Sequence, residues 1–278
     1  GREYIIPFLE SLREKYGKPL TVVRDMWGEI ADSVSDVFPS ISQQVCHYHF
    51  VRNLGDILFK HRYEELRRII LKTKILARIL ALKKICMDGI SYHQRILIAE
   101  HYWVRLAIEY VLYPRERKSD YPFILPYLEV IDRVIKVLEM LKKIVMWNAR
   151  HNICVKTVLK LEHYLKKLAE TLEIKIWHSK IKLIQEWFEE IRKVLRVSRE
   201  LSDKEQNVQP TKVDEIEPKF YDTIIKIRDE GRKLGAEYVE ISKKIFQTCH
   251  DHMDELFVEV KDLNGEEIGI VRHNGIEE

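Results

Sequence analysis

Apolar residues recur every three or four positions through most of this chain, a spacing typical of amphipathic α-helices. The pattern is clearest after Pro122, where it predicts three successive helices. Their apolar positions are Leu125, Leu128, Ile131, Ile135, Leu138, Leu141 and Val145, then Val158, Leu161, Leu165, Leu168 and Leu172, and then Ile184, Phe188, Ile191 and Leu195. Such strict spacing favours antiparallel helices whose side chains interlock as in coiled coils.

Further helical patterns occupy much of the rest of the chain. They predict helices over residues 4–16, 27–37, 51–86, 91–112 and 219–252. Gly17 is expected to end the first helix as its C′ residue. Pro114 and the charged run that follows to Asp120 predict a loop. The polar residues 202–218, which include two prolines, predict a linker.

Four stretches have the β-branched or alternating character of strands. Residues 20–25 and 43–49 predict two strands in the first part of the chain. Residues 256–260 and 268–271, with Asn264-Gly265 as turn, predict a β-hairpin near the other end. The order helix, strand, helix, strand at the start is typical of a piece of an α/β sheet. The predicted fold class is therefore mainly α with a small α/β part.

Candidate chemistry lies at the ends of the first two predicted strands. The first apolar run stops on Asp25, and open α/β sheets bind ligands at the edge where their strands end. The second run carries Cys46 and His49 and leads into a long helical pattern beginning with Arg52 and Asn53. Phe38-Pro39 separates the two runs and predicts a turn.

These residues resemble the catalytic core of DDE transposases of the Mutator-like group, which includes many prokaryotic insertion-sequence enzymes. Asp25 matches the family's second catalytic Asp, Phe38-Pro39 matches its turn, and Cys46, His49, Arg52 and Asn53 match a Cys-x-x-His-x-x-Arg-Asn signature. A weaker match covers residues 272–278, which resemble the segment leading to the family's last acid.

The resemblance implies a partial RNase H-like catalytic core that is interrupted by a large helical insertion. Residues 1–50 would form the core, residues 51–252 the insertion, and residues 253–278 a β-hairpin and the start of the last acidic helix. Three carboxylates would hold Mg²⁺ or Mn²⁺ for DNA cleavage and strand transfer in cut-and-paste transposition. Asp25 and Glu278 would be metal ligands, with Glu277 as the alternative to Glu278, since neighbouring helical residues point about 100° apart.

The resemblance also assigns supporting roles. Cys46 and His49 would lie beside the active site, and His49 would contact the scissile region or orient a water molecule. The family's first acid belongs on a strand upstream of residues 4–16. No Asp in the sequence has that position, so the chain alone is expected to be inactive. Its partners would be transposon-end and target DNA, within a homo-oligomeric active complex.

The distribution of charge along the sequence favours a DNA-binding surface in one part of the chain. Residues 52–118 contain 15 Lys and Arg against 7 Asp and Glu, although the whole chain has a net charge of only +3. Such a local excess is typical of a polyanion footprint, but unevenly charged helix faces produce the same imbalance. The predicted DNA-binding residues are Arg52, Asn53, Arg67, Arg68, Lys72 and Lys74.

Other interpretations of the same residues remain open. Asp25 could instead be the N-cap of a helix that starts at Met26, and Glu278 a solvated terminal residue. Cys46 and His49 could be a buried Cys and a hydrogen-bonded His, or half of a zinc site completed by Cys249, His250 or His252. The whole chain could be a non-catalytic helical protein that binds DNA or protein, such as a domesticated or decayed transposase.

Several classes are excluded or disfavoured. The sequence has no phosphate-binding glycine loop and no nucleophile elbow, so nothing indicates a nucleotide or flavin cofactor. It has no signal peptide and no apolar run long enough to cross a membrane. Four cysteines without regular spacing indicate a reducing compartment. The resemblance implies that this compartment is the prokaryotic cytoplasm, with the protein associated with the nucleoid. The helical spacing of most of the five Trp residues predicts ordinary core or interface positions.

Overall fold

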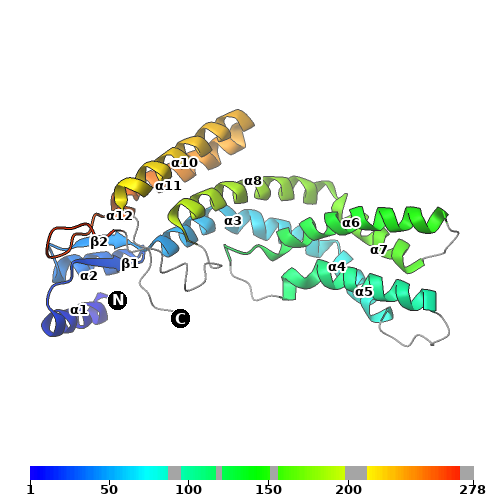
Figure 1. Ribbon diagram of the computed structural model, residues 1–278, viewed down its shortest axis with the longest axis horizontal. Helices are drawn as coiled ribbons and strands as arrows, with labels where there is room; N and C mark the ends of the chain where they lie inside the picture. The colour runs from blue at the N-terminus through cyan, green and yellow to red at the C-terminus, as the bar shows by residue number, and fades with distance from the viewer. Residues whose placement is uncertain (87–94, 117–120, 151–155, 198–211, 270–278) are drawn as a thin grey trace. The chain divides into compact units, whose positions relative to one another are not determined.

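The computed structural model describes residues 1–86, 95–116, 121–150, 156–197 and 212–269 (Figure 1). Its strands are β1 Thr21–Arg24 and β2 Ser42–Val45. Its helices are α1 Arg2–Tyr16, α2 Gly28–Val37, α3 His47–Lys72, α4 Ile75–Ile85, α5 Arg95–Glu116, α6 Pro126–Arg150, α7 Lys156–Ala169, α8 Leu172–Leu195, α10 Val213–Leu234, α11 Ala236–Asp251 and α12 Met253–Leu256. The prediction of a mainly helical chain with a small α/β part is therefore confirmed over these residues. None of the described helices has the length and apolar composition needed to cross a membrane.

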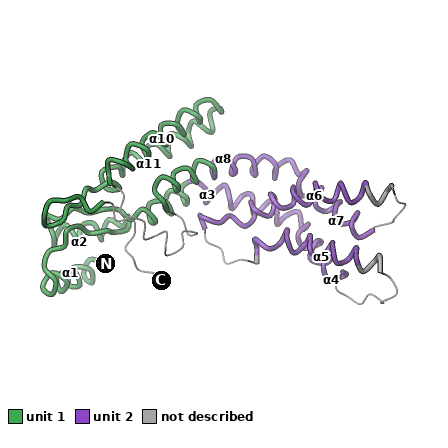
Figure 2. Tube along the Cα trace, viewed as in Figure 1, with its two compact units in different colours: residues 1–57, 186–278 green, residues 58–185 purple. Residues whose placement is uncertain are grey.

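The chain divides into two compact units (Figure 2). The first unit consists of Gly1–Ile57 together with Glu186–Glu278, and the second consists of Leu58–Gln185. The first unit contains β1, β2 and the helices α1, α2, α10, α11 and α12. The second unit contains α4, α5, α6 and α7, so the first unit is built from two segments that are distant in the sequence.

The start of the first unit follows the predicted α/β order. β1 and β2 pair in parallel, with Thr21 opposite Ser42 and Arg24 opposite Val45. One face of α2 buries Val34 and Val37 beside Phe38, and α1 and β1 cover this small core. The partly buried residues around it are Ile6, Leu9, Val22, Ile30 and Ile41. The core explains why α1 and α2 form at the predicted positions.

The predicted helix stop at Gly17 and the predicted turn at Phe38-Pro39 are both confirmed. Gly17 has a φ of 80°, a left-handed conformation that favours glycine, and its N–H donates to the carbonyl of Arg13. Phe38 ends α2 by donating its N–H to Val34, and its own carbonyl accepts from Ile41. The two turns precede β1 and β2, whose parallel pairing places the ends of both strands at the same edge of the sheet.

The second predicted strand, residues 43–49, is too long. β2 ends at Val45, and α3 begins at His47. The carbonyl of Cys46 already accepts the N–H of Phe50, so Cys46 is the N-cap of α3. The helical spacing of the buried Phe50 and Leu54 prevails over the β-branched character of the run, because both side chains are fully buried from one helix face. His49 therefore belongs to the first turn of a helix and not to a strand.

The predicted helix over residues 219–252 is two helices that turn back on each other. α10 ends at Leu234 and α11 begins at Ala236, with Gly235 between them at a φ of 110°. α10 also starts at Val213, so the latter part of the predicted linker at 202–218 is helical, including Pro218. Gly231 of α10 is buried against Ser242 of α11, which allows the two backbones to approach closely.

The predicted β-hairpin near the end of the chain is only partly formed. Its turn is present, because Asp262 Oδ1 accepts the N–H groups of Asn264 and Glu266, and Gly265 has a φ of 83°. However, Lys261 and Glu267 form an isolated antiparallel bridge in place of two paired strands. The residues expected to begin the first strand lie in and after the short helix α12. Residues 270–271 of the predicted second strand lie outside the described residues.

Two helices of the second unit begin with a cap supplied by another helix. Glu100 of α5 is buried, and its Oε1 accepts the N–H groups of Thr157 and Val158 at 2.6 and 3.0 Å, in the first turn of α7. Tyr63 of α3 accepts the N–H of Tyr127 at 3.1 Å, in the first turn of α6. Both contacts satisfy N–H groups that have no partner within their own helix.

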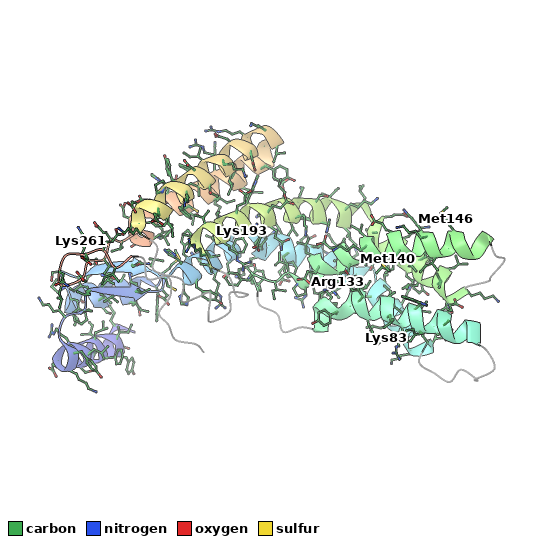
Figure 3. All side chains as sticks on the ribbon, in the orientation of Figure 1. Lys83, Arg133, Met140, Met146, Lys193 and Lys261 are labelled. Carbon is green, nitrogen blue, oxygen red and sulfur yellow. The ribbon has the colours of Figure 1, made fainter. Side chains whose placement is uncertain are left out.

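Two boundaries in the second unit differ from the prediction. The pattern over 51–86 breaks into α3 and α4 at Lys74, which has a φ of 56°. Pro114, predicted to begin a loop, lies in the last turn of α5. Proline has no N–H to donate to the carbonyl of Tyr110, four residues earlier, and Arg133 of α6 donates its Nη1 to that carbonyl at 2.8 Å instead. Figure 3 labels Arg133 among the side chains. This contact explains how α5 continues through the proline.

A charged cluster connects α6 to α8. Asp132 accepts hydrogen bonds from His178 Nε2 at 2.8 Å and from Lys182 Nζ at 2.7 Å. Partial burial acts to raise the pKa of the Asp132 carboxyl, but the hydrogen bonds from His178 and Lys182 outweigh it and lower the pKa below its ordinary value. A carboxyl with a lowered pKa stabilises the folded state at pH values above its unfolded pKa.

We therefore expect Asp132→Asn to lower the free energy of unfolding by on the order of 1 kcal/mol at pH 7. The difference from the unchanged protein should shrink as the pH falls below about 4, because Asp132 is then protonated in the unfolded chain, while in the folded state its lowered pKa keeps it ionised to a lower pH. Urea unfolding at pH 7 and pH 3 measures both values. Glu139→Gln is the control, since Glu139 is exposed on the same helix. A difference that stays constant with pH would contradict the prediction.

Candidate functional site

The candidate site lies at the edge where the two parallel strands end. Arg24 and Val45 are the last paired residues, so Asp25 and Cys46 follow their strands side by side. The N–H of Cys46 donates to the carbonyl of Arg24 at 2.7 Å and continues the pairing at this edge. The structure thus brings together two of the predicted site residues, at the position where parallel sheets bind ligands.

The Asp25 carboxylate is held on one side. Its Oδ1 accepts the backbone N–H of Trp27 at 2.8 Å, and no described residue donates to its Oδ2. The predicted alternative, that Asp25 is the N-cap of a helix starting at Met26, is wrong, because α2 starts at Gly28 and Trp27 is its N-cap. Asp25 is partly exposed, and its Oδ2 is a hard oxygen ligand of the kind that Mg²⁺ and Mn²⁺ bind.

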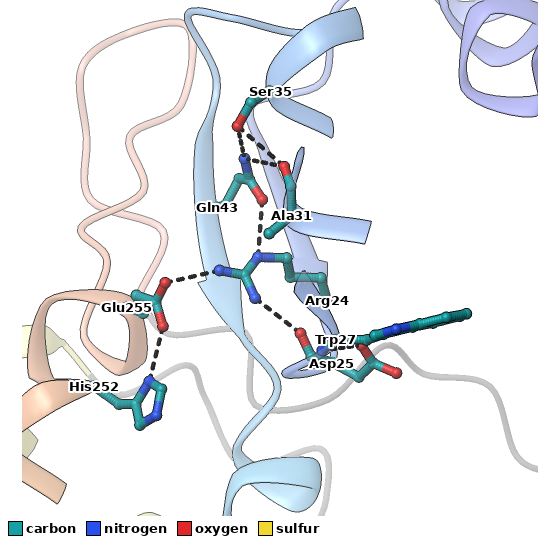
Figure 4. Close-up of polar contacts among 8 residues, drawn as sticks. All are labelled: Arg24, Asp25, Trp27, Ala31, Ser35, Gln43, His252 and Glu255. Atoms are coloured by element: carbon teal, nitrogen blue, oxygen red, sulfur yellow. Dashed lines mark hydrogen bonds and ion pairs between the residues drawn. The ribbon is translucent and has the colours of Figure 1, made fainter. Parts of the chain in front are cut away.

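Arg24, directly before Asp25, has three hydrogen-bond partners that connect this edge to β2 and α12 (Figure 4). Its guanidinium donates to the Gln43 side chain of β2 at 2.8 Å, to the main-chain carbonyl of Asp25 at 2.9 Å, and to Glu255 of α12 at 2.8 Å. Glu255 in turn accepts from His252 Nδ1 at 2.9 Å. Partial burial acts to raise the pKa of Glu255, but the hydrogen bond from His252 and the charge of Arg24 lower it overall.

The first turns of α3 form another side of the candidate site. His47 is buried, and its Nε2 lies 2.9 Å from the carbonyl of Leu256. His49 is half-buried, with its ring edge-on to Tyr48. Asn53, one turn after His49 on the same helix face, donates to the sulfur of Met26 at 3.5 Å. This contact connects the face that carries His49 to the residue that follows Asp25.

The described part of the structure does not bring the other predicted metal ligands to this edge. Glu277 and Glu278 lie outside them, as does the predicted acidic helix. Among the residues that the structure describes, no three His, Cys, Asp or Glu side chains gather closely enough to hold a metal ion. The alternative zinc site is also unsupported, because Cys249 is fully buried with a raised thiol pKa and His252 is bonded to Glu255.

The predicted DNA-binding side chains are all exposed. They are Arg52, Asn53, Arg67, Arg68, Lys72 and Lys74. Two of them are partly neutralised within α3, because Arg67 pairs with Glu64 at 3.4 Å and Arg68 pairs with Glu65 at 2.5 Å. Lys72, Lys74 and Arg52 form no ion pair with any residue that the structure describes. These three charges are therefore the most available to an anionic partner.

Trp residues are more exposed than their helical spacing predicted. Trp187 is buried as expected, but Trp27 and Trp103 are exposed by 51% and 58%. Trp27 is the residue whose backbone N–H holds the Asp25 carboxylate. Its exposed ring therefore lies at the candidate edge and not in the core.

Sequence reasoning missed Arg24, His252 and Glu255. An arginine in an otherwise apolar strand, next to a candidate catalytic acid, was a signal for Arg24, because a buried guanidinium needs a charged partner. No sequence pattern indicated which acid would supply it. Glu255 lies 231 residues away, in a short helix that the sequence did not predict.

Comparison with known proteins agrees with this site. A family model described as transposase, for the ISL3 group of DDE enzymes, matches residues 1–203. Searches of curated proteins and of solved structures gave no match. The predicted relation to insertion-sequence DDE transposases is confirmed, and the narrower Mutator-like assignment is corrected to the ISL3 group. Because the match spans Asp25, the Cys-x-x-His segment and more than half of the chain, this protein belongs to the ISL3 family of DDE transposases.

Proposed function

We propose that the chain takes part in metal-dependent DNA cleavage and strand transfer in cut-and-paste transposition, with Asp25 as a metal-binding catalytic acid. Membership of a DDE transposase family implies DNA as the partner and a divalent metal in general terms. The observation that carries the proposal for this chain is the position of Asp25 at the end of β1. There Trp27 orients one carboxylate oxygen and leaves the other without a donor among the described residues.

Among the described residues, Asp25 is the proposed metal ligand, and its carboxylate is the hard oxygen donor that Mg²⁺ and Mn²⁺ prefer. When bound, a pair of such ions stabilises the attacking and the leaving oxygen of a phosphoryl transfer. Asp25 would provide one ligand, and Glu278, or alternatively Glu277, a second. His49, half-buried on the helix face next to Met26, would contact the scissile phosphate region. Cys46 is only 1% exposed, so its contribution would be to pack the edge that holds Asp25.

The same proposal assigns a core and an insertion. The α/β residues 1–50 would belong to an RNase H-like core, to which residues 253–278 return after a helical insertion at 51–252. The contact of α12 with the end of β1, through Glu255 and Arg24, supports the return of the chain to this edge. α10 and α11 lie in the same compact unit as β1 and β2.

The metal proposal predicts that Asp25→Asn weakens Mn²⁺ binding by more than about tenfold, because carboxylates supply most of the affinity of such sites. Titration of the full chain with Mn²⁺, followed by water-proton relaxation, measures the dissociation constant. Asp222→Asn is the matched control, since Asp222 is an exposed Asp on α10 in the same unit. Equal Mn²⁺ affinities for the unchanged protein and Asp25→Asn would remove Asp25 from the metal site.

The DNA proposal predicts a salt-dependent interaction through the exposed cations after Arg52. The double variant Lys72→Ala/Lys74→Ala should lower the slope of log affinity against log salt by about 2, because each lost phosphate contact contributes about 0.9. Gel shifts between low and moderate salt measure this slope. Lys243→Ala/Lys244→Ala removes two exposed lysines from α11 and is the control. An affinity that does not depend on salt would contradict phosphate contacts, and salt-dependent DNA binding without Mn²⁺ binding would indicate a non-catalytic DNA-binding protein.

A further inference from the structure

We infer that Arg24 is a positioning residue for Asp25, and that Glu255 of α12 holds Arg24 in place. The inference rests on the proposed function for its catalytic meaning, since Asp25 is the residue being positioned. Arg24 does not approach the reacting atoms itself: its guanidinium bonds the main-chain carbonyl of Asp25, and not the carboxylate. Its effect on chemistry would therefore pass through the backbone of Asp25.

The guanidinium has one orientation because each of its three nitrogens has a different partner. Nε donates to Gln43 Oε1, Nη1 to the Asp25 carbonyl and Nη2 to Glu255 Oε1, all between 2.8 and 2.9 Å. Gln43 is fixed in turn, because its amide nitrogen donates to the carbonyl of Ala31 and to Ser35 Oγ of α2 (Figure 4). The position of Arg24 is thus set by α2, β2 and α12 together.

Glu255 has a second partner besides Arg24, at its other carboxylate oxygen. His252 Nδ1 contacts its second oxygen at 2.9 Å, and the His252 ring packs edge-on to Phe50 of α3 at 5.8 Å. His47, at the start of α3, contacts the carbonyl of Leu256 in α12 at 2.9 Å. Two contacts therefore fix α12 against the beginning of α3, and through Glu255 they fix the guanidinium.

Burial makes this arrangement sensitive to the loss of either partner. Only 8% of the Arg24 side chain is exposed, and Glu255 is its one carboxylate partner among the described residues. A buried guanidinium without a carboxylate is strongly unfavourable, so the side chain would move toward water and leave the Asp25 carbonyl. Lysine cannot replace it, because one ammonium group does not reproduce three planar donors in fixed directions.

The consequence for the site concerns the orientation of the carboxylate. Arg24 donates to the main-chain carbonyl of Asp25, and the N–H of Trp27 donates to the side-chain Oδ1 of Asp25. The backbone and the side chain of Asp25 are therefore each held by one hydrogen bond. Groups that orient a ligand typically change metal affinity by about 10- to 100-fold when removed. We assign this orienting role to Arg24 and Glu255.

The test measures Asp25 geometry and metal affinity separately, in the full chain. Hydrogen exchange of the Trp27 amide, observed by NMR after ¹⁵N-tryptophan labelling, reports whether the bond to Asp25 Oδ1 is intact. Arg24→Lys and Glu255→Gln should each accelerate this exchange by about tenfold or more, and weaken Mn²⁺ binding by about 10- to 100-fold. Trp27→Phe identifies the resonance.

Two controls separate positioning from general stability. Glu190→Gln removes the acid from an exposed ion pair with Lys226 in the same unit and should change neither measurement. Ile245→Val weakens the buried core of α11 without touching the Arg24 contacts, and should lower the melting temperature with little effect on Trp27 exchange. If Ile245→Val accelerates Trp27 exchange as much as Glu255→Gln does, Arg24 is merely structural and the inference is overturned.

The remaining outcomes distinguish the two proposals. Unchanged Trp27 exchange in both Arg24→Lys and Glu255→Gln overturns the positioning role, whatever the Mn²⁺ affinity. Accelerated exchange in these variants, with no Mn²⁺ binding by the unchanged protein, supports the positioning of Asp25 and overturns its proposed metal role. Accelerated exchange with weakened Mn²⁺ binding supports both.

Discussion

Phe220→Ala should lower the free energy of unfolding by about 3–5 kcal/mol, the range for deleting a fully buried aromatic side chain. Phe220 of α10 is 0% exposed and has an aromatic ring on each of two neighbouring segments. Its centroid lies 6.4 Å from that of Phe50 in α3 and 5.2 Å from that of Phe257 after α12, both in edge-on arrangements. The substitution therefore leaves a cavity where three segments of the first unit meet.

The same cavity should also affect the candidate site. Phe257 follows α12 directly, and its ring lies 5.9 Å from that of His47, which contacts the carbonyl of Leu256. Loss of the Phe220 ring removes its contact with Phe257, which directly follows α12, the helix that carries Glu255. We therefore expect Phe220→Ala to weaken Mn²⁺ binding as well as stability.

Urea unfolding and Mn²⁺ titration of the same variant test these two effects. Tyr221→Ala is the control, because the neighbouring Tyr221 is 40% exposed and packs only loosely on Phe246, with centroids 6.5 Å apart. Its loss should cost below about 1 kcal/mol. Similar destabilisation by the two substitutions would show that the aromatic junction does not carry the stability assigned to it.

Gly231→Ala should destabilise the α10–α11 pair by about 3 kcal/mol, the upper part of the range for overpacking a core. A Cβ at position 231 would lie 2.1 Å from Ser242 Oγ, 2.5 Å from Ser242 Cβ and 2.8 Å from the backbone carbonyl of Tyr238. The carbonyl belongs to the backbone of α11, so a side-chain rotation cannot relieve the contact. Alanine favours helix formation by about 1 kcal/mol over glycine, which offsets only part of this cost.

Thermal unfolding measures the effect, and two further variants define its cause. Gly28→Ala is the matched helical control: no atom lies within 4 Å of its added Cβ, so it should be neutral or slightly stabilising. Gly231→Ala combined with Ser242→Gly should recover part of the loss, because two of the three close contacts disappear. A destabilisation of equal size for Gly28→Ala and Gly231→Ala would show that close helix approach is not the cause.

Both predictions concern segments near the C-terminal part of the described chain, and the first of them also concerns an acid near its start. The aromatic junction holds α12 against α3, α12 supplies Glu255, and Glu255 neutralises the arginine that bonds the Asp25 carbonyl. The early strand therefore receives its orientation from residues about 230 positions later. This dependence makes long-range stability variants informative about the candidate site.

The sequence by itself determined the elements whose signals are local. The position of Asp25 at the end of β1, the helix stop at Gly17, the turn at Phe38 and the helical periodicity after Pro122 all depend on residues within a few positions of one another. Periodicity and left-handed glycine conformations act over such distances. For the same reason Asp25, the Phe38-Pro39 turn and the Cys-x-x-His-x-x-Arg-Asn signature together indicated a DDE transposase of the insertion-sequence kind, although not its ISL3 group.

Tertiary structure alone decided what depends on partners distant in the chain. Residues 47–49 were predicted to be part of a strand but begin a helix, because Phe50 and Leu54 are buried on one face of that helix. α5 continues through Pro114 because Arg133 satisfies the carbonyl that the proline leaves without a donor. Arg24 stays buried because the fold brings Glu255 to it. Each outcome requires a charge, a donor or an apolar surface from another element, and sequence spacing carries no information about which element supplies it.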